Sequence, residues 1–207
     1  VLYHIIKEPV RVSFIKKMQH ASWSLVTFIN ENNWSLQGIE INLNKQYHNV
    51  SLKARADLVL KRAEELVVLD LKWKGLNRRK EEIRNLEDLQ LTFYVDLLSE
   101  ENKQMHSAYF IISRAQIIAR NNLAFKEATA VSPKLDHEAV HQLIINKIEK
   151  TLEWRMQQLQ KGQIEVRCNS TQKALEEHYG DQLLDLLEMK SSNAFFDDYA
   201  ALIGRLD

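Results

Sequence analysis

Asp57, Asp70 and Lys72 carry the clearest chemical signal in the sequence. Asp70 and Lys72 lie at the end of a mostly apolar segment, and side chains two residues apart in a strand point to the same face. Two neighbouring carboxylates repel each other unless a cation lies between them, and Mg²⁺ typically binds one or two carboxylates together with waters and phosphate oxygens. The pattern therefore suits metal-assisted hydrolysis of a phosphodiester, with Lys72 orienting the attacking water or favouring its deprotonation.

The segments that carry these residues, 52–60 and 66–73, are predicted to form an antiparallel hairpin, because only a short charged connection joins them. A register symmetric about residues 63 and 64 places Asp57 opposite Asp70, with Cβ atoms about 5 Å apart. It assigns Ala56 to the opposite, apolar face. A slip by one residue would destroy this sorting of polar and apolar side chains, so we expect the symmetric register.

The rest of the chain is predicted to supply helices and further strands around the hairpin, from periods near 3.6 and 2 in its apolar residues. The predicted elements are a helix over 13–32, a strand over 38–44, a basic segment over 74–84 leading into one long helix that ends near residue 99, a buried strand over 107–113, a helix over 136–160 and a helix over 170–190 broken near residue 180. This order predicts an α/β core over residues 1–130 and an all-helical extension over 131–207 that packs on it.

Composition excludes several classes of protein. Five glycines and two prolines among 207 residues are too few for an all-β barrel or sandwich, which needs many tight turns. Basic and acidic residues balance at 28 each, so contact with nucleic acid would need a local patch. Cys168 is the single cysteine, which excludes a disulfide framework and a four-cysteine iron–sulfur cluster.

The same features bear on location. A lone thiol is typical of a reducing cytoplasm, and no apolar run approaches the roughly 18 residues of a membrane span. We therefore expect a cytoplasmic protein without a membrane anchor. The chain begins with Val1 and shows no signal-peptide pattern, so we interpret it as a piece of a longer polypeptide.

Three motifs together resemble a known family, the PD-(D/E)XK nucleases, and most closely its RecB-like and AddB-like branch. They are Ala54-Arg55-Ala56-Asp57, Asp70-Leu71-Lys72 and Gln90-x-x-x-Tyr94. The resemblance covers roughly residues 14–113. It implies a restriction-endonuclease-like core, with a small mixed central sheet flanked by helices, followed by a helical C-terminal extension.

The chain departs from this family's pattern at a few positions. Ala54 and Ala56 replace the usual glycine and isoleucine, which leaves the chemistry untouched, and Leu71 replaces a common tyrosine. Many relatives tie their C-terminal region with a four-cysteine iron–sulfur cluster. With one cysteine this chain is expected to lack that cluster, so apolar packing must hold residues 131–207 instead.

The resemblance implies a role for each motif residue. Asp57, Asp70 and the main-chain carbonyl of Leu71 would bind Mg²⁺ or Mn²⁺, and Lys72 would be the catalytic lysine. Gln90 and Tyr94 would complete the active site or touch DNA, although a polar stripe on a helix is an equally good reading of their spacing. The family often has one more metal ligand upstream, for which the two candidates are His20 and Glu40.

A basic segment follows the hairpin, with six cationic residues between positions 72 and 84. It is either a track for a phosphate backbone or a solvated loop and helix start. The predicted DNA-binding residues are Arg55, Lys74, Arg78, Arg79 and Lys80. Trp73 follows Lys72 directly and could meet a nucleotide.

These observations predict a metal-dependent DNA nuclease, an exonuclease rather than an endonuclease, from a helicase–nuclease system for DNA end processing and recombinational repair. The chain has no Walker-type phosphate-binding motif, so a helicase module would lie elsewhere in the full-length chain or on a partner subunit. One alternative is a catalytically silent nuclease-fold module that binds DNA or serves as a scaffold.

A second alternative comes from His137-Glu138-Ala139-Val140-His141, which matches the His-Glu-x-x-His pattern of zinc peptidases. Glu149, Glu153 or Glu165 would then be the third ligand. The pattern is short, and the amphipathic spacing of the following apolar residues indicates an ordinary packing helix.

Overall fold

A computed structural model describes residues 8–47, 50–99, 103–132, 134–163, 177–178, 180 and 186–187. The chain divides into two compact units, Val1–Val140 and His141–Asp207. The packing of residues 131–207 on the core remains a prediction. None of the described helices combines the length and the apolar character that a membrane span requires.

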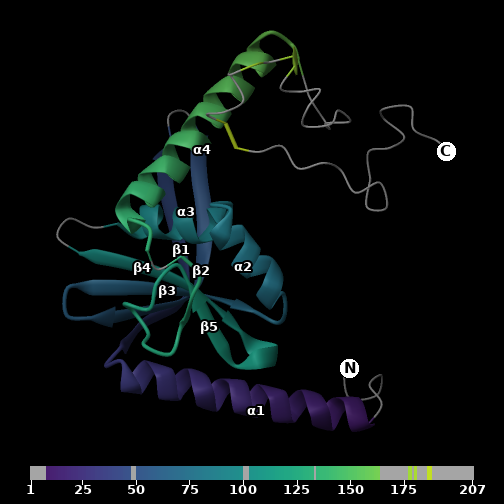
Figure 1. Cartoon of the computed structure of the whole chain (residues 1–207), viewed down its shortest axis with the longest axis vertical. Helices are drawn as coiled ribbons and strands as arrows, with labels where there is room; N and C mark the ends of the chain where they lie inside the picture. Colours follow the sequence, from purple (N-terminus) through teal and green to yellow (C-terminus); the bar gives the residue numbers. More distant parts are fainter. Residues whose placement is uncertain are drawn as a thin grey trace. The chain divides into compact units, whose positions relative to one another are not determined.

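The first unit is built on a mixed six-stranded sheet in the order β1-β2-β3-β4-β5-β6 (Figure 1). Strands β1 to β3 are antiparallel, β3 and β4 are parallel, β4 and β5 are antiparallel, and β5 and β6 are parallel. The strands are β1 Ser35–Tyr47, β2 Val50–Arg62, β3 Glu65–Lys72, β4 Gln104–Ile111, β5 Gln116–Ala119 and β6 Thr129–Ala130. The predicted α/β class with a small mixed sheet and flanking helices is confirmed.

Helices cover both faces of this sheet (Figure 1). Helix α1, Glu8–Glu31, packs Ala21 against Leu58 and Leu69 on one face. Helices α2, Leu76–Arg84, and α3, Leu89–Leu98, form the crossover that a parallel β3–β4 pair requires, and they pack on the other face. Helix α4, His137–Gln160, follows the sheet. The core thus fills two layers, one on each side of β3.

The β2–β3 hairpin has the predicted register from Leu58 to Arg62, but the ladder ends before the predicted pair of Asp57 and Asp70. Leu58 pairs with Leu69, and the two-residue turn falls at residues 63 and 64. The face predicted for Ala56 is wrong, because Ala56 packs in the cluster of Val59 and Val68 on the α3 side. Residues three apart share a face only where the alternation of a strand is interrupted.

The interruption lies at Glu40 and Asp57. Glu40 adopts a left-handed backbone with φ of 50°, which is uncommon for any residue other than glycine. The β1–β2 ladder pairs Leu58 with Ile39 and Ala56 with Ile41, and it passes over Asp57. Asp57 is therefore not paired with β1 in the ladder.

Three further sequence predictions need correction or lie outside the described residues. The basic segment expected to lead into a long helix is itself a helix, α2, and the helix that ends near residue 99 is the ten-residue α3, which Leu86 with its left-handed φ of 60° separates from α2. Strands β5 and β6 were not expected, since they are too short to show alternation. Most of the helix predicted over 170–190 falls outside the described residues.

Candidate active site

The site lies where β3 ends, on the face of the sheet covered by α3. Asp70, only 1% exposed, projects there from β3, and the Lys72 ammonium lies 2.8 Å from its Oδ2. Asp57 reaches over from β2, and its Oδ2 accepts a hydrogen bond of 2.8 Å from the backbone N–H of Leu71. The structure therefore brings together the two aspartates and the lysine that the spacing singled out.

Helix α3 supplies the remaining predicted partners, Gln90 and Tyr94, one turn apart. The Gln90 amide Nε2 donates to Asp70 Oδ1 at 2.7 Å and to the Tyr94 hydroxyl at 2.8 Å, which uses both of its hydrogens. Tyr94 has a single hydroxyl proton, and the shorter of its contacts is to the main-chain carbonyl of Arg55 at 2.9 Å, against 3.4 Å to Asp70 Oδ1. These bonds tie α3 to β2 and β3 together.

The Arg55 carbonyl was not predicted as part of the site. A main-chain acceptor has no residue-type signature, so only the β2–β3 register combined with the position of α3 could have indicated it. This carbonyl accepts the hydrogen bond of the Tyr94 hydroxyl and so holds that hydroxyl close to Asp70.

The two oxygens of Asp70 have different surroundings. Oδ1 is held by Gln90. Oδ2 is buried and has no hydrogen bond of good geometry, although it forms an ion pair with Lys72. A buried acceptor without a hydrogen bond costs free energy unless something positive lies against it. The fixed Oδ1 thus leaves Oδ2 as the oxygen able to bind a ligand.

The pKa values of Asp70 and Tyr94 are both shifted from their ordinary values at this site. Burial raises the pKa of Asp70, the ammonium of Lys72 lowers it, and the nearby carboxylate of Asp57 raises it further. Burial is also the main reason why the pKa of Tyr94 is raised, and the two carboxylates add to it. Tyr94 therefore keeps its proton at neutral pH and remains a hydrogen-bond donor.

The residues fit a hard divalent cation. Carboxylate and carbonyl oxygens are the ligands that Mg²⁺ and Mn²⁺ prefer. The Oδ2 of Asp70 has no hydrogen bond, so an ion could bind it without breaking one. Among the described residues no group of three or more His, Cys, Asp or Glu side chains could hold a metal ion. An ion at Asp57 and Asp70 would therefore complete its shell with a main-chain carbonyl, water and phosphate, as is usual for Mg²⁺.

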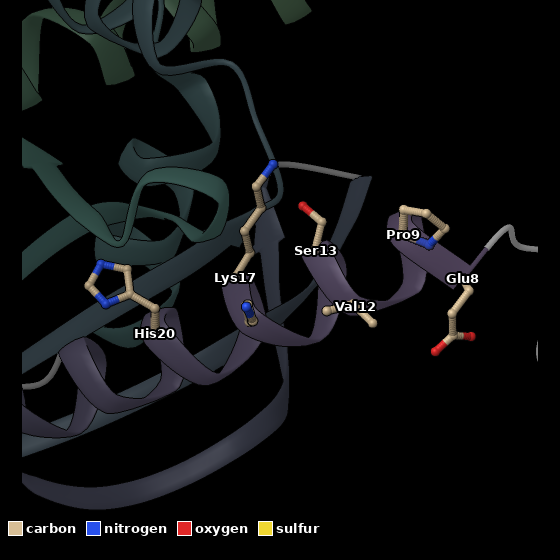
Figure 2. A pocket seen from close by; sticks show the side chains of 7 residues that line it. Glu8, Pro9, Val12, Ser13, Lys17 and His20 are labelled. Atoms are coloured by element: carbon tan, nitrogen blue, oxygen red, sulfur yellow. The ribbon is translucent and has the colours of Figure 1, made fainter.

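Neither candidate outer ligand contacts the aspartates among the described interactions, although Glu40 stands opposite Asp57 between the ladder pairs of β1 and β2. Glu40 forms an ion pair of 2.7 Å with Arg55, and both side chains are more than half exposed. His20 lines an exposed groove on α1 together with Lys16 and Lys17 (Figure 2). Two ammonium groups favour an anion over a cation. The structure does not join Glu40 or His20 to the aspartates, and their roles as metal ligands stay predictions.

The predicted DNA-binding residues fall into two groups. Arg78 and Arg79 both pair with Glu82, and the Arg79 guanidinium stacks 5.0 Å from the ring centroid of Tyr109. Arg79 is 21% exposed and packs α2 onto the sheet, whereas the Arg78 side chain is 72% exposed. Sequence reasoning missed this packing role, because a run of basic residues does not show which one turns inward.

The other basic residues of the predicted track remain accessible. Lys74 is exposed, Lys80 is half-buried, and neither forms an ion pair within the described part of the chain. Arg55 is exposed but engaged with Glu40. DNA binding by these residues remains a prediction, with Lys74 and Arg78 the most accessible.

The zinc-peptidase motif gains no support. His137 opens α4, and its Nδ1 is buried without a hydrogen bond, which agrees with the pKa of His137 being lowered mainly by burial. The described residues include Glu149 and Glu153, yet they hold no cluster of three possible ligands. Glu165 lies outside the described residues.

Comparison with known proteins gives the family. A comparison with curated proteins found no match. The model of the PD-(D/E)XK nuclease superfamily matches residues 7–179, which is well over half of the chain and includes every residue of the site described above. The chain therefore belongs to the PD-(D/E)XK nuclease superfamily.

Proposed function

We propose that this chain is a metal-dependent DNA nuclease of the RecB-like or AddB-like type, and that it hydrolyses phosphodiester bonds at the end of β3. The observation that carries the proposal is the convergence of Asp57 and Asp70, with the Lys72 ammonium 2.8 Å from Asp70. Membership of the nuclease superfamily supports it independently.

Each residue has a distinct task in this proposal. Asp57, Asp70 and the Leu71 carbonyl would hold Mg²⁺ or Mn²⁺, which when bound supplies a Lewis acid and lowers the pKa of water. Lys72 is 25% exposed, so its ammonium can face the scissile phosphate, orient the attacking water and balance the charge that builds on the phosphate. Gln90 holds Asp70 in the orientation that this requires.

The finer assignment rests on the motif resemblance. That branch of the superfamily works beside a helicase in DNA end processing and repair, and favours exonuclease action. This chain carries no phosphate-binding loop of a motor, which agrees with a helicase module elsewhere in the full-length protein or on a partner. The complete set of Asp57, Asp70 and Lys72 argues against a silent module, since such a module would have no use for both carboxylates.

The experiment is a gel assay of labelled single- and double-stranded DNA with Mg²⁺, Mn²⁺ or EDTA. We expect metal-dependent cleavage by the parent chain and none by Asp57→Asn. Asp96→Asn is the matched control, because Asp96 lies on α3 but pairs with Lys45 instead of the site. Equal cleavage by Asp57→Asn and the parent would refute the assignment, and inert parent protein on every substrate would favour the silent module.

A further inference from the structure

Helix α1 carries a second apolar face besides the one that packs on the sheet. Leu25, Phe28 and Ile29 pack with Ala21 in the cluster of the sheet. At about 100° per residue, another set of apolar side chains lies about 135° around the helix axis from this face. That set, the outer stripe, consists of Val12, Ile15, Trp23 and Val26, and all four are exposed. Apolar stripes of a helix are normally buried against another element.

The exposure of the outer stripe sets it apart from the core of the same unit. Trp23 is 76% exposed and Val26 is 55% exposed. Trp34 is 5% exposed, and its indole N–H donates to the carbonyl of Ala124 at 2.7 Å. Aromatic side chains that stabilise a core are normally buried and satisfied in this way. Core packing therefore does not explain why α1 carries Trp23.

The edge of the sheet adds exposed apolar surface on the same side. Leu36 and Ile39 of β1 are both more than 60% exposed. They pair across the ladder with Leu60 and Leu58, which belong to the cluster under α1. Directly paired residues on neighbouring strands share a face, so these two side chains lie on the α1 face of the sheet. Apolar surface of this extent is typical of a protein–protein contact.

The outer stripe is its own complement when a second copy lies antiparallel to it. Val12 and Val26 are each seven residues from Gln19, and Ile15 and Trp23 are each four residues from it. A twofold axis at Gln19 therefore places Val12 of one copy against Val26 of the second copy, and Ile15 against Trp23. The two Gln19 amides meet at the axis, where each can donate to the other and accept from it.

The charges of α1 favour the same orientation. Residues 18–30 contain no Asp, Glu, Lys or Arg, whereas the amino-terminal half carries Arg11, Lys16 and Lys17. The antiparallel arrangement sets the charged half of one helix against the uncharged half of the other. A parallel arrangement would set Lys16 and Lys17 beside their own copies, where like charges repel.

We propose that two copies of this chain associate through the outer stripe of α1, as an antiparallel helix pair with Gln19 at the twofold axis. Trp23 is the main anchor, because aromatic side chains dominate the centres of such contacts while lysines lie at their rims. The stripe spans about 21 Å of helix, so the contact is at the small end of specific interfaces and the dimer dissociates on dilution.

This association does not depend on the proposed function. The α1 face of the sheet is opposite to the face on which α3 covers Asp57 and Asp70. A dimer through α1 therefore leaves both candidate active sites open. Association is measured without DNA or metal, so its failure and the failure of the nuclease assignment are separate results.

The first test is sedimentation equilibrium of the 207-residue chain over about two decades of concentration. We expect a monomer–dimer equilibrium for the parent chain, and at least about tenfold weaker association for Trp23→Ala. Leu123→Ala is the matched control, because Leu123 is 59% exposed but lies outside α1. A parent chain that stays monomeric throughout would overturn the proposal and leave the stripe to a different protein. Unchanged association in Trp23→Ala, or equal weakening in Leu123→Ala, would also overturn it.

The second test fixes the orientation by cross-linking with a short bismaleimide, in a Cys168→Ser background that removes the native thiol. Gln19→Cys should form covalent dimers, because its two copies meet at the axis. Asn30→Cys is the control, since Asn30 is also exposed on the outer side of α1, but its two copies lie about 33 Å apart along the pair. Cross-linking of neither variant, or more cross-linking through Asn30→Cys than through Gln19→Cys, would overturn the antiparallel pair.

Discussion

Two buried aspartates in the first unit have similar surroundings, yet we propose a catalytic role for Asp70 and a structural role for Asp88. The side chains of Asp70 and Asp88 are 1% and 0% exposed, and each has a cationic nitrogen 2.8 Å away, from Lys72 and Arg120 respectively. Burial is the main reason why the pKa of each carboxyl is raised. Burial and a perturbed pKa therefore do not by themselves distinguish a reactive carboxylate from a structural one.

The two aspartates differ in the groups that surround their ion pairs with Arg120 and Lys72. Arg120 also donates to the Thr92 hydroxyl, which donates to the Asp88 carbonyl at the start of α3, although Asp88 Oδ2 is buried without a hydrogen bond, as Asp70 Oδ2 is. Asp70 instead faces a second carboxylate, Asp57, and a cation that is a quarter exposed. One acid paired with one arginine balances its charge and anchors a helix, whereas two acids beside one accessible lysine leave negative charge that a metal ion could neutralise.

The largest expected effect comes from Asp70→Asn. We expect cleavage to fall to background because the carboxylate at the centre of the proposed metal site is lost. The fold should survive, with a melting temperature equal to or above that of the parent, since an amide removes a charge that burial disfavours. Activity assays with thermal unfolding of the same samples check this. Retained cleavage would place the chemistry elsewhere.

Asp88→Ala should show the opposite pattern. It leaves the Arg120 guanidinium, 14% exposed, without its carboxylate, and breaking such a buried pair typically costs about 3–5 kcal/mol in the free energy of unfolding. Cleavage per folded molecule should be unchanged at a temperature where the variant is folded. Denaturant unfolding measures the first quantity. A loss of cleavage in fully folded Asp88→Ala would erase the proposed distinction between the two clusters.

Tyr94→Phe should have an intermediate effect. It removes the hydroxyl that accepts a hydrogen bond from the Gln90 amide and donates one to the Arg55 carbonyl. Gln90, which holds Asp70, is then less well fixed, while the Asp70 carboxylate itself is kept. Groups that orient metal ligands typically contribute 10–100-fold to metal affinity or activity. The measurement is the metal concentration that gives half-maximal cleavage, which should rise. Tyr109→Phe is the control, because Tyr109 is equally buried but contacts Arg79.

Much of this site could be predicted from sequence, because it depends on local patterns. The β2–β3 register followed from the sorting of Leu58 and Leu69, and the spacing of Gln90 and Tyr94 placed both on one helix face. What could not be predicted depends on contacts across the fold. Arg120 lies on a segment with no visible pattern, and nothing near it in sequence indicates a bond to Asp88.

The predictions for the Arg79 side chain and for the face of Ala56 were wrong for related reasons. Arg79 stacks on Tyr109, a residue thirty positions later, so its role depends on how α2 packs on β4. Ala56 lies on the face opposite to the predicted one because the alternation of β2 is interrupted at Asp57, which stands opposite the left-handed residue Glu40 of β1. Backbone irregularities of this kind arise where tertiary contacts override local preference.

The smallest expected effect concerns pH. The pKa of Asp88 is raised in the folded chain, chiefly by burial and against the influence of Arg120, from an ordinary value of 3.8. Between that value and its raised pKa, the folded state holds the proton that the unfolded state releases, so this residue's contribution to stability falls as pH rises. Asp88→Asn lacks the titrating group and keeps an oxygen for Arg120. The free energy of unfolding of the parent relative to Asp88→Asn should therefore decline as pH rises above 3.8, and level off once Asp88 is ionised in both states. Chemical unfolding at several pH values gives this difference, and a difference that rises with pH would mean that the Arg120 pair outweighs burial.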